Sequence, residues 1–152
     1  MERTDRISRE EAFLDIALVF AKRSTCERGQ TGCVITLDNR IISTGYNGPT
    51  KGADHCGEGC NTSLPCTRSV HAEANAIYFA ARNGIRLNGS VLYTTHSPCL
   101  KCCEAIVQAG IYLVIYMETF RETDGFRLLD ENNVMYEMWI NKNSTNQHKI
   151  VL

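Results

Sequence analysis

The spacing of hydrophobic and polar positions predicts that helices and strands follow one another along the chain. The first periodic segment spans residues 8–23. Its apolar side chains recur at the spacing of one helix face, at Phe13, Ile16, Ala17 and Phe20. Ser8 and Glu11 at its start have the spacing of a capping box, in which each side chain bonds the other residue's backbone N–H. We therefore expect the chain to open with an amphipathic helix.

Two short β-branched runs follow this helix, at residues 32–37 and 40–46. They meet at Asp38-Asn39, a pair that favours a tight turn, so the two runs are predicted to form a hairpin. A loop rich in Gly, Pro and Cys is expected from Gly48 to about Thr67. A second helix is predicted from Val70 to Arg82, where Asn83-Gly84 would end it.

The second half of the chain alternates strands with helices. Strands are predicted at 91–95, 111–117 and 133–139, and helices at 98–109 and 124–132. In the first of these helices Ser97 is expected as N-cap, Pro98 at the first position and Gly110 just past the end. Such alternation favours parallel strands in a sheet covered on both faces, which is an α/β fold. A polar tail is expected from Asn141.

Length and charge limit the classes of function. A chain of 152 residues has the size of one domain with a real core, so we expect a single domain over 1–152. Its net charge of −1 argues against binding a nucleic-acid polymer but leaves small anionic ligands open. The longest apolar run is broken by Asp15 and is too short to span a bilayer, and no signal-peptide pattern opens the chain. We expect a cytoplasmic protein without membrane contact.

Eight cysteines raise the choice between disulfides and metal binding. Six of them lie near histidine or in closely spaced sets, at Cys26, Cys56, Cys60, Cys66, Cys99 and Cys102. Without a secretory signal, such groups more often bind metal than form disulfides. Cys33 and Cys103 fall on strand and helix positions that suit small core residues.

The interpretation of one pair of cysteines depends on a histidine elsewhere in the sequence. Cys99 and Cys102 are three positions apart on the first predicted turn of a helix, so their sulfurs point the same way. Alone, this C-x-x-C is also compatible with a redox pair, half a structural zinc site or two buried small residues. With His71 the protein ligands number three, and a fourth tetrahedral position stays open, as in a catalytic zinc site.

Glu73 fits this site as a proton carrier. It lies two residues after His71, about 200° around a helix, so the two side chains do not share a face and need not share a role. A carboxylate beside a zinc-bound water can take a proton from it and pass it to a leaving group. His71-Ala72-Glu73 followed by Pro98-Cys99-x-x-Cys102 is the signature of zinc deaminases, in which hydroxide attacks a ring carbon and ammonia leaves.

Longer stretches resemble one family of such enzymes. "RIISTGYNGPTKGADHC", "HAEANAIYFAARNG" and "LYTTHSPCLKCCEAIVQAGI" are similar to deoxycytidylate (dCMP) deaminases, especially those of bacteriophages and bacteria. The resemblance runs from about residue 8 to 139, and "GYNGP" is its most discriminating piece. It implies a three-layer α/β/α cytidine-deaminase-like fold with a mixed five-stranded sheet in the order 2-1-3-4-5. It also implies production of dUMP for thymidylate synthesis.

The resemblance assigns roles residue by residue. His71, Cys99 and Cys102 match the catalytic zinc ligands, and Glu73 matches the proton shuttle. Substrate contacts are implied for the sugar at Asn47, for the base at the Ala72 and Ser97 backbone, and for pocket closure at Phe120 or Arg121. Asn47 is also compatible with an ordinary turn position.

The resemblance further implies a homohexamer that dCTP with Mg²⁺ activates and dTTP inhibits. Residues expected near the effector are Arg28, Gln30, Gly45, Tyr46, Asn47, Gly48 and Arg82. The two glycines could let backbone approach a phosphate closely. Arg28 is equally compatible with a solvated surface side chain, and Arg82 with packing or solvation alone.

A second, structural zinc is expected from the remaining cysteines. Phage-type relatives carry such a site, and Cys26 and Cys56 match its pattern best. Cys60 and Cys66 would complete a four-sulfur set, in which His55 could replace one of the cysteines. Reduced cysteines without metal are the alternative.

Other classes share parts of the pattern. A tRNA or single-stranded DNA deaminase would normally present a basic surface, which the charge of −1 opposes. A riboflavin-pathway deaminase usually carries a fused reductase, for which 152 residues leave no room. A non-catalytic zinc module would have no use for Glu73.

Overall fold

The computed structural model describes residues 5–57, 60–121 and 123–141, and its centre is a mixed five-stranded sheet. The strands are β1 (Gly32–Leu37), β2 (Arg40–Tyr46), β5 (Val91–His96), β6 (Leu113–Glu118) and β7 (Met135–Met138). Their order is β2-β1-β5-β6-β7, which is 2-1-3-4-5 in chain order, as predicted. β1 runs antiparallel to β2 and β5, whereas β5, β6 and β7 are parallel.

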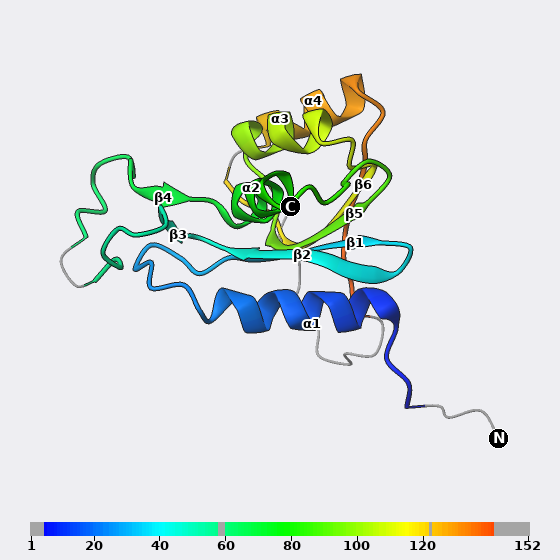
Figure 1. The fold of residues 1–152 in the computed structure, drawn as a ribbon, viewed down its shortest axis with the longest axis horizontal. Coiled ribbons are helices and arrows are strands. Elements are labelled where there is room, and N and C mark those ends of the chain that lie inside the picture. Colours follow the sequence, from blue (N-terminus) through cyan, green and yellow to red (C-terminus); the bar gives the residue numbers. More distant parts are fainter. Residues whose placement is uncertain (1–4, 58–59, 122, 142–152) are drawn as a thin grey trace.

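Helices cover both faces of the sheet. They are α1 (Arg9–Ala21), α2 (Ala72–Arg82), α3 (Leu100–Gln108) and α4 (Asp124–Glu131). Figure 1 shows α1 on one face and the other three on the opposite face. Each face has its own core: Leu14 and Ala17 pack with Val34 on the α1 side, and Ile106 and Leu129 belong to the core on the other side. The predicted three-layer α/β/α architecture is confirmed.

Local sequence signals explain where these elements begin and turn. The Ser8 hydroxyl accepts a hydrogen bond from the Glu11 N–H at 3.1 Å, which confirms that half of the predicted capping box. The β1–β2 turn places Asp38 and Asn39 at positive φ, as a tight hairpin requires. Gly110 follows α3 with a φ of 74°, the left-handed conformation that ends many helices.

The segment between β2 and α2 is more ordered than predicted. Within the expected loop, β3 (Gly48–Pro49) pairs antiparallel with β4 (Ser69–Val70). Val70, predicted as the first helical residue, is therefore part of a strand, and α2 begins only at Ala72. The reason is tertiary, because the partner of Val70 is Gly48, a residue far away in sequence.

Among the described residues, no helix is long and apolar enough to cross a membrane. The polar tail predicted from Asn141 lies almost entirely outside the described residues.

Candidate functional site

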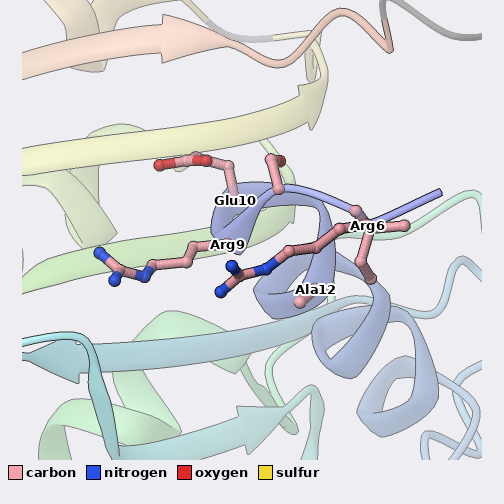
Figure 2. A pocket seen from close by; sticks show the side chains of 6 residues that line it. Arg6, Arg9, Glu10 and Ala12 are labelled. Atoms are coloured by element: carbon pink, nitrogen blue, oxygen red, sulfur yellow. The ribbon is translucent and has the colours of Figure 1, made fainter. Parts of the chain in front are cut away.

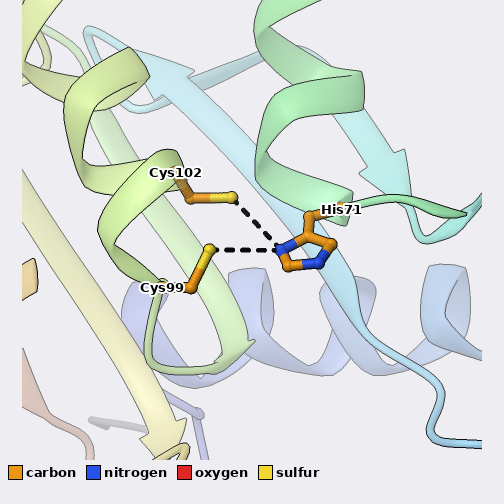
Figure 3. Close-up of side chains that lie close together, drawn as sticks. All are labelled: His71, Cys99 and Cys102. Carbon is orange, nitrogen blue, oxygen red and sulfur yellow. Dashed lines mark hydrogen bonds between the residues drawn. The ribbon is translucent and has the colours of Figure 1, made fainter. Parts of the chain in front are cut away.

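The three predicted zinc ligands meet where α2 and α3 begin. Figure 3 shows the sulfurs of Cys99 and Cys102 pointing at the ring of His71. The His71 Nδ1 atom lies 3.3 Å from Sγ of Cys99 and 3.6 Å from Sγ of Cys102. The three ligand atoms all lie within 4.8 Å of one another. Residues from two segments of the chain therefore form one compact group.

The spacing of these atoms fits a tetrahedral zinc centre. Zn–N and Zn–S bonds of about 2.05 and 2.3 Å at a tetrahedral angle place nitrogen and sulfur about 3.6 Å apart. Both observed N–S distances lie close to this value. Cys102 is buried, Cys99 is partly buried and His71 is exposed, so the group is reached from one side. Three protein ligands on such a surface leave room for a fourth, non-protein ligand.

Helix starts hold two of the ligands. His71 is the N-cap residue of α2 and Cys99 that of α3, and both have extended backbone conformations. Ser97 was predicted as the N-cap of α3, and this prediction is wrong by two residues. The Ser97 hydroxyl instead accepts the Phe120 N–H at 2.7 Å, and Pro98 precedes the helix. Because Cys99 is the N-cap of α3, its side chain lies at the positive end of the helix dipole. This position favours a thiolate.

The protonation tendencies of the group agree with a metal-binding role. The pKa of Cys99 is lowered to about 3, chiefly because Cys102 donates a hydrogen bond to its sulfur, and His71 adds to the effect. The pKa of His71 is raised, mainly by its hydrogen bond with Cys99. The pKa of Cys102 is raised because its thiol is the donor to Cys99 and because it is buried. A bound cation would favour the thiolate at both sulfurs.

Glu73 is held beside this group in the first turn of α2. It is only 4% exposed, and its Oε2 lies 3.5 Å from the Cys102 sulfur. Its Oε1 lies 3.4 Å from the Thr94 hydroxyl on β5. Burial raises the pKa of the Glu73 carboxyl above its ordinary value. A carboxyl with a raised pKa is suited to both accepting and releasing a proton near neutral pH.

Thr94 was not predicted from the sequence as part of the site. It lies in the largely buried strand β5, where a threonine is typical because its side chain is β-branched. It is fully buried, and its hydroxyl also donates to the His96 carbonyl at 3.0 Å. A hydroxyl within a buried strand was the one sequence signal that could have indicated a polar role.

The predicted substrate residues surround the same end of the sheet. Asn47 follows β2 and is 9% exposed, and its side chain bonds the Thr31 N–H at 2.8 Å and the Gly29 carbonyl at 2.9 Å. Ala72 is buried at the start of α2. The Ser97 N–H donates to the Glu118 carbonyl at 2.8 Å, so Ser97 ties the start of the α3 segment to the end of β6.

Phe120 and Arg121 lie just beyond β6, separated from its last residue by Thr119. The Phe120 side chain is 41% exposed, and Arg121 is exposed. Their backbone is anchored to the metal-binding segment through the Phe120 N–H, which donates to the Ser97 hydroxyl. This position agrees with the predicted role in closing the pocket, and that role stays a prediction.

The residues predicted near an effector have other partners in the structure. Gln30 donates to the Ser24 carbonyl at 2.7 Å, and the Arg23 guanidinium lies 6.0 Å from the Tyr46 ring centre. Gly45 is buried, and a side chain there would collide with the Ala72 carbonyl. Close packing thus accounts for this glycine without a phosphate. Gly48 belongs to β3, and Arg82 is exposed at the end of α2.

The other cysteines do not form a metal-sized group within the described residues. Cys26, Cys56, Cys60 and Cys66 are reduced, and no three of them gather as the first site does. The Arg28 side chain lies among them instead: its Nε donates to Cys60 Sγ at 3.4 Å and its Nη2 to the Asn61 carbonyl at 2.6 Å.

A surface hollow lies apart from this site, at the start of α1. Figure 2 shows the side chains around it, and all of them come from the short segment between Arg6 and Ala12. None of the predicted site residues lines it.

The sequence model described as "Cytidine and deoxycytidylate deaminase zinc-binding region" matches residues 7–118. This range contains His71, Glu73, Cys99 and Cys102.

Individual relatives agree with this match. The chain is 42% identical over 119 residues to "ComE operon protein 2" of Bacillus subtilis, covering 77% of this chain and 63% of that protein. It is 40% identical over 124 residues to "Deoxycytidylate deaminase" of Mycobacterium phage D29, covering 70% of this chain and 92% of the phage protein. The chain spans less than half of the deoxycytidylate deaminases of two yeasts, Schizosaccharomyces pombe (38%) and Saccharomyces cerevisiae (42%).

A solved structure agrees in fold as well as in sequence. The dCMP deaminase of cyanophage S-TIM5, in complex with dCMP and dUMP, superposes with a TM-score of 0.80 at 33% identity. The superposition covers 86% of this chain and 96% of the cyanophage chain. Because the family model covers residues 7–118, well over half of the chain, this chain belongs to the cytidine and deoxycytidylate deaminase zinc-binding family.

Proposed function

We propose that this chain catalyses the hydrolytic deamination of dCMP to dUMP and ammonia. One observation carries the proposal: Glu73 is buried and in contact with Cys102, and the Cys102 sulfur converges with Cys99 and His71 on one point. The choice of dCMP rests on the phage relative named deoxycytidylate deaminase and on the cyanophage enzyme bound to dCMP and dUMP.

The donor set of His71, Cys99 and Cys102 fits zinc. When bound there, zinc would supply Lewis-acid chemistry that makes a water molecule a stronger acid and nucleophile at neutral pH. The buried Glu73 carboxyl takes a proton from the attacking water on one of its oxygens. It then delivers a proton to the amino group that leaves carbon 4 of the cytosine ring as ammonia. Its raised pKa supports both steps.

Other residues would orient the nucleotide. The Ala72 and Ser97 backbones are proposed to read the base edge, and both lie next to metal ligands in the sequence. Asn47 uses one lone pair of its amide oxygen for Thr31 and one N–H of its amide nitrogen for Gly29. The second lone pair and the second N–H are proposed to bond the sugar 3′-hydroxyl. Phe120 and Arg121 would close the pocket over base and phosphate.

Regulation, assembly and cellular role form the finer part of the proposal. We propose a cytoplasmic homohexamer, in the host cytoplasm if the protein is viral, that supplies dUMP for thymidylate synthesis. dCTP with Mg²⁺ would activate it and dTTP would inhibit it. The effector would contact the segment of Arg28 and Gln30, residues 45–48 and Arg82. The segments around Arg28 and Asn47 do lie together, because Asn47 bonds the Gly29 carbonyl.

A structural zinc at the second set of cysteines is also proposed. Cys60 lies near the segment that follows Cys26, because its N–H bonds the Glu27 carboxylate at 3.1 Å and its sulfur accepts from Arg28. Metal binding would have to bring the four sulfurs closer together, because no three of them form a metal-sized group among the described residues.

A substrate panel tests the proposal. Cytidine, deoxycytidine, CMP, dCMP, dCTP and adenosine would be followed by ultraviolet absorbance and ammonia release, each with and without dCTP and Mg²⁺. We expect dCMP to react far better than deoxycytidine, because the 5′-phosphate gains basic partners that the nucleoside leaves unpaired. Equal rates on these two substrates would overturn the assignment of dCMP.

A further inference from the structure

Asn75 links the helix of the metal site to the segment that carries Asn47. It lies on α2 two residues after Glu73, and its N–H donates to the His71 carbonyl at 2.9 Å within the first turn. Its side-chain amide leaves the helix and donates to the Tyr46 carbonyl at 2.7 Å, at the end of β2. Only the amide nitrogen can donate to a carbonyl, which fixes the orientation of the side chain.

The steric environment makes this hydrogen bond a specific one. The strand before Tyr46 runs directly against the first turn of α2, because a side chain at Gly45 would collide with the Ala72 carbonyl and the Ala76 N–H. Contact at Gly45 limits how closely β2 can approach α2. The bond from Asn75 adds a direct tie between the start of α2 and the last residue of the strand.

The effect of this bond extends beyond Tyr46. The next residue, Asn47, donates its N–H to the Thr31 carbonyl at 3.2 Å and accepts the Thr31 N–H on its side chain at 2.8 Å. Its amide group also donates to the Gly29 carbonyl. Hydrogen bonds therefore run without interruption from the first turn of α2 through residues 46–47 to residues 29–31.

The other residues of the metal site do not depend on this connection. Glu73 contacts Thr94 and Cys102, and His71 contacts the two cysteines of α3. If the bond from Asn75 is lost, residues 46–47 keep their pairing with β1 and the segment before it but lose this tie to α2, whereas the ligands and the carboxyl keep the contacts just named.

We propose that Asn75 is a positioning residue that sets the distance between the metal site and the sugar end of the pocket. It acts through the Tyr46 carbonyl on Asn47 and does not touch the substrate. The substrate part of this inference rests on the proposed function, whereas the positional part concerns the protein alone.

The test compares two hydrogen bonds between the same two elements. Asn75→Leu keeps the branching of the side chain and removes its donor, and Asn75→Ala serves as a second variant if Leu impairs folding. The matched control is Ser43→Ala, because the Ser43 hydroxyl on β2 donates to the Ala76 carbonyl of α2, also at 2.7 Å. This control removes an equally short hydrogen bond between β2 and α2, at a position of β2 that is more distant from Asn47 in the sequence.

In the zinc-loaded enzyme we expect Asn75→Leu to raise KM for dCMP about tenfold, the usual value of one hydrogen bond, while kcat changes less than about threefold. Zinc content should stay at the level of the unmodified enzyme. Ser43→Ala should leave KM within about twofold. This should hold even if Ser43→Ala lowers the melting temperature as much as Asn75→Leu does. An unchanged KM in both Asn75 variants, or the same rise in Ser43→Ala, would overturn the proposal.

A measurement without nucleotide separates this inference from the proposed function. Amide hydrogen exchange should become faster at Thr31 and Asn47 in the Asn75 variants and stay unchanged there in Ser43→Ala. If exchange at these two amides does not change, Asn75 does not position the segment. An unmodified enzyme inactive on dCMP would defeat the proposed function, and exchange would still decide the positional claim.

Discussion

Two cysteine-containing regions of this protein use similar residue types with different results. At the first, Cys99, Cys102 and His71 place their ligand atoms within 4.8 Å of one another. At the second, Cys26, Cys56, Cys60 and Cys66 form no comparable group among the described residues. Close spacing in the sequence therefore does not by itself hold metal ligands together in advance of metal binding.

Secondary structure accounts for the difference. The first site is held by the starts of two packed helices, and these helices rest on a central sheet. In the second region, three of the four cysteines lie in a long segment whose only regular structure in its described part is the short β3–β4 pair. Ordering ligands on such irregular backbone carries an entropic cost that a metal would have to offset.

The largest effect is expected from the carboxyl beside the first site. Glu73→Gln should lower turnover of dCMP about 10²- to 10⁴-fold while zinc stays bound, because the carboxylate carries protons and is not a ligand. The measurement pairs the deamination rate with zinc content. Glu104→Gln is the matched control, since this carboxylate on α3 is exposed and pairs with the exposed Lys101. Loss of zinc, or activity above about a tenth of the original, would contradict the role of Glu73.

Metal content tests the second region directly. We expect about two zinc ions per chain, and Cys56→Ser should remove about one of them and lower the melting temperature while deamination persists. Cys99→Ser should remove the other zinc together with the activity. A content of about one zinc in the unmodified protein would mean that the second set of cysteines stays reduced and unmetallated.

A smaller effect is expected from the arginine among these cysteines. Arg28→Ala should weaken both activation by dCTP with Mg²⁺ and inhibition by dTTP, a coupling typically worth about 5- to 150-fold in affinity. Saturation curves for dCMP would show it, with a sigmoidal response that dCTP no longer makes hyperbolic. Arg68→Ala is the control, because this arginine bonds the Asp54 carbonyl in the same region. Hyperbolic kinetics that neither triphosphate changes would show that regulation is absent.

The smallest effect concerns stability and pH. Burial raises the pKa of Glu73, so the folded protein holds its proton at pH values where the unfolded chain, with a pKa near 4.5, has lost it. Stability of zinc-free protein should therefore fall as pH rises from below 4.5 through the raised pKa of Glu73.

The uncharged side chain in Glu73→Gln removes this dependence. The variant should melt at a higher temperature than the unmodified protein at neutral pH, and the difference should vanish at acidic pH. The Glu104→Gln control should show no such difference. An equal gain at all pH values would argue against a buried ionisable group as the cause.

Much of the fold followed from local signals. The hairpin turn at Asp38-Asn39 and the end of α3 before Gly110 agree with the local expectations, and the sheet order agrees with what the family resemblance implied. The missed features all involve residues distant in sequence. Val70 joined β4, and Ser97 bonds Phe120, 23 residues later, in place of capping α3. A capping preference describes one residue and its neighbours, so a competing partner from another strand cannot be read from it.

The sequence by itself determined the ingredients of the site: His71 and Glu73 two residues apart, and Cys99 and Cys102 one helical turn apart. These relations are local, and helix geometry fixes them wherever the helix lies. Only the tertiary structure brought His71 to cysteines 28 and 31 residues away and placed Thr94 beneath Glu73. Packing of α2 and α3 on the sheet decided these contacts. Burial of apolar surface sets the position of each whole helix, and the polar side chains on a helix are carried to the place where that helix packs.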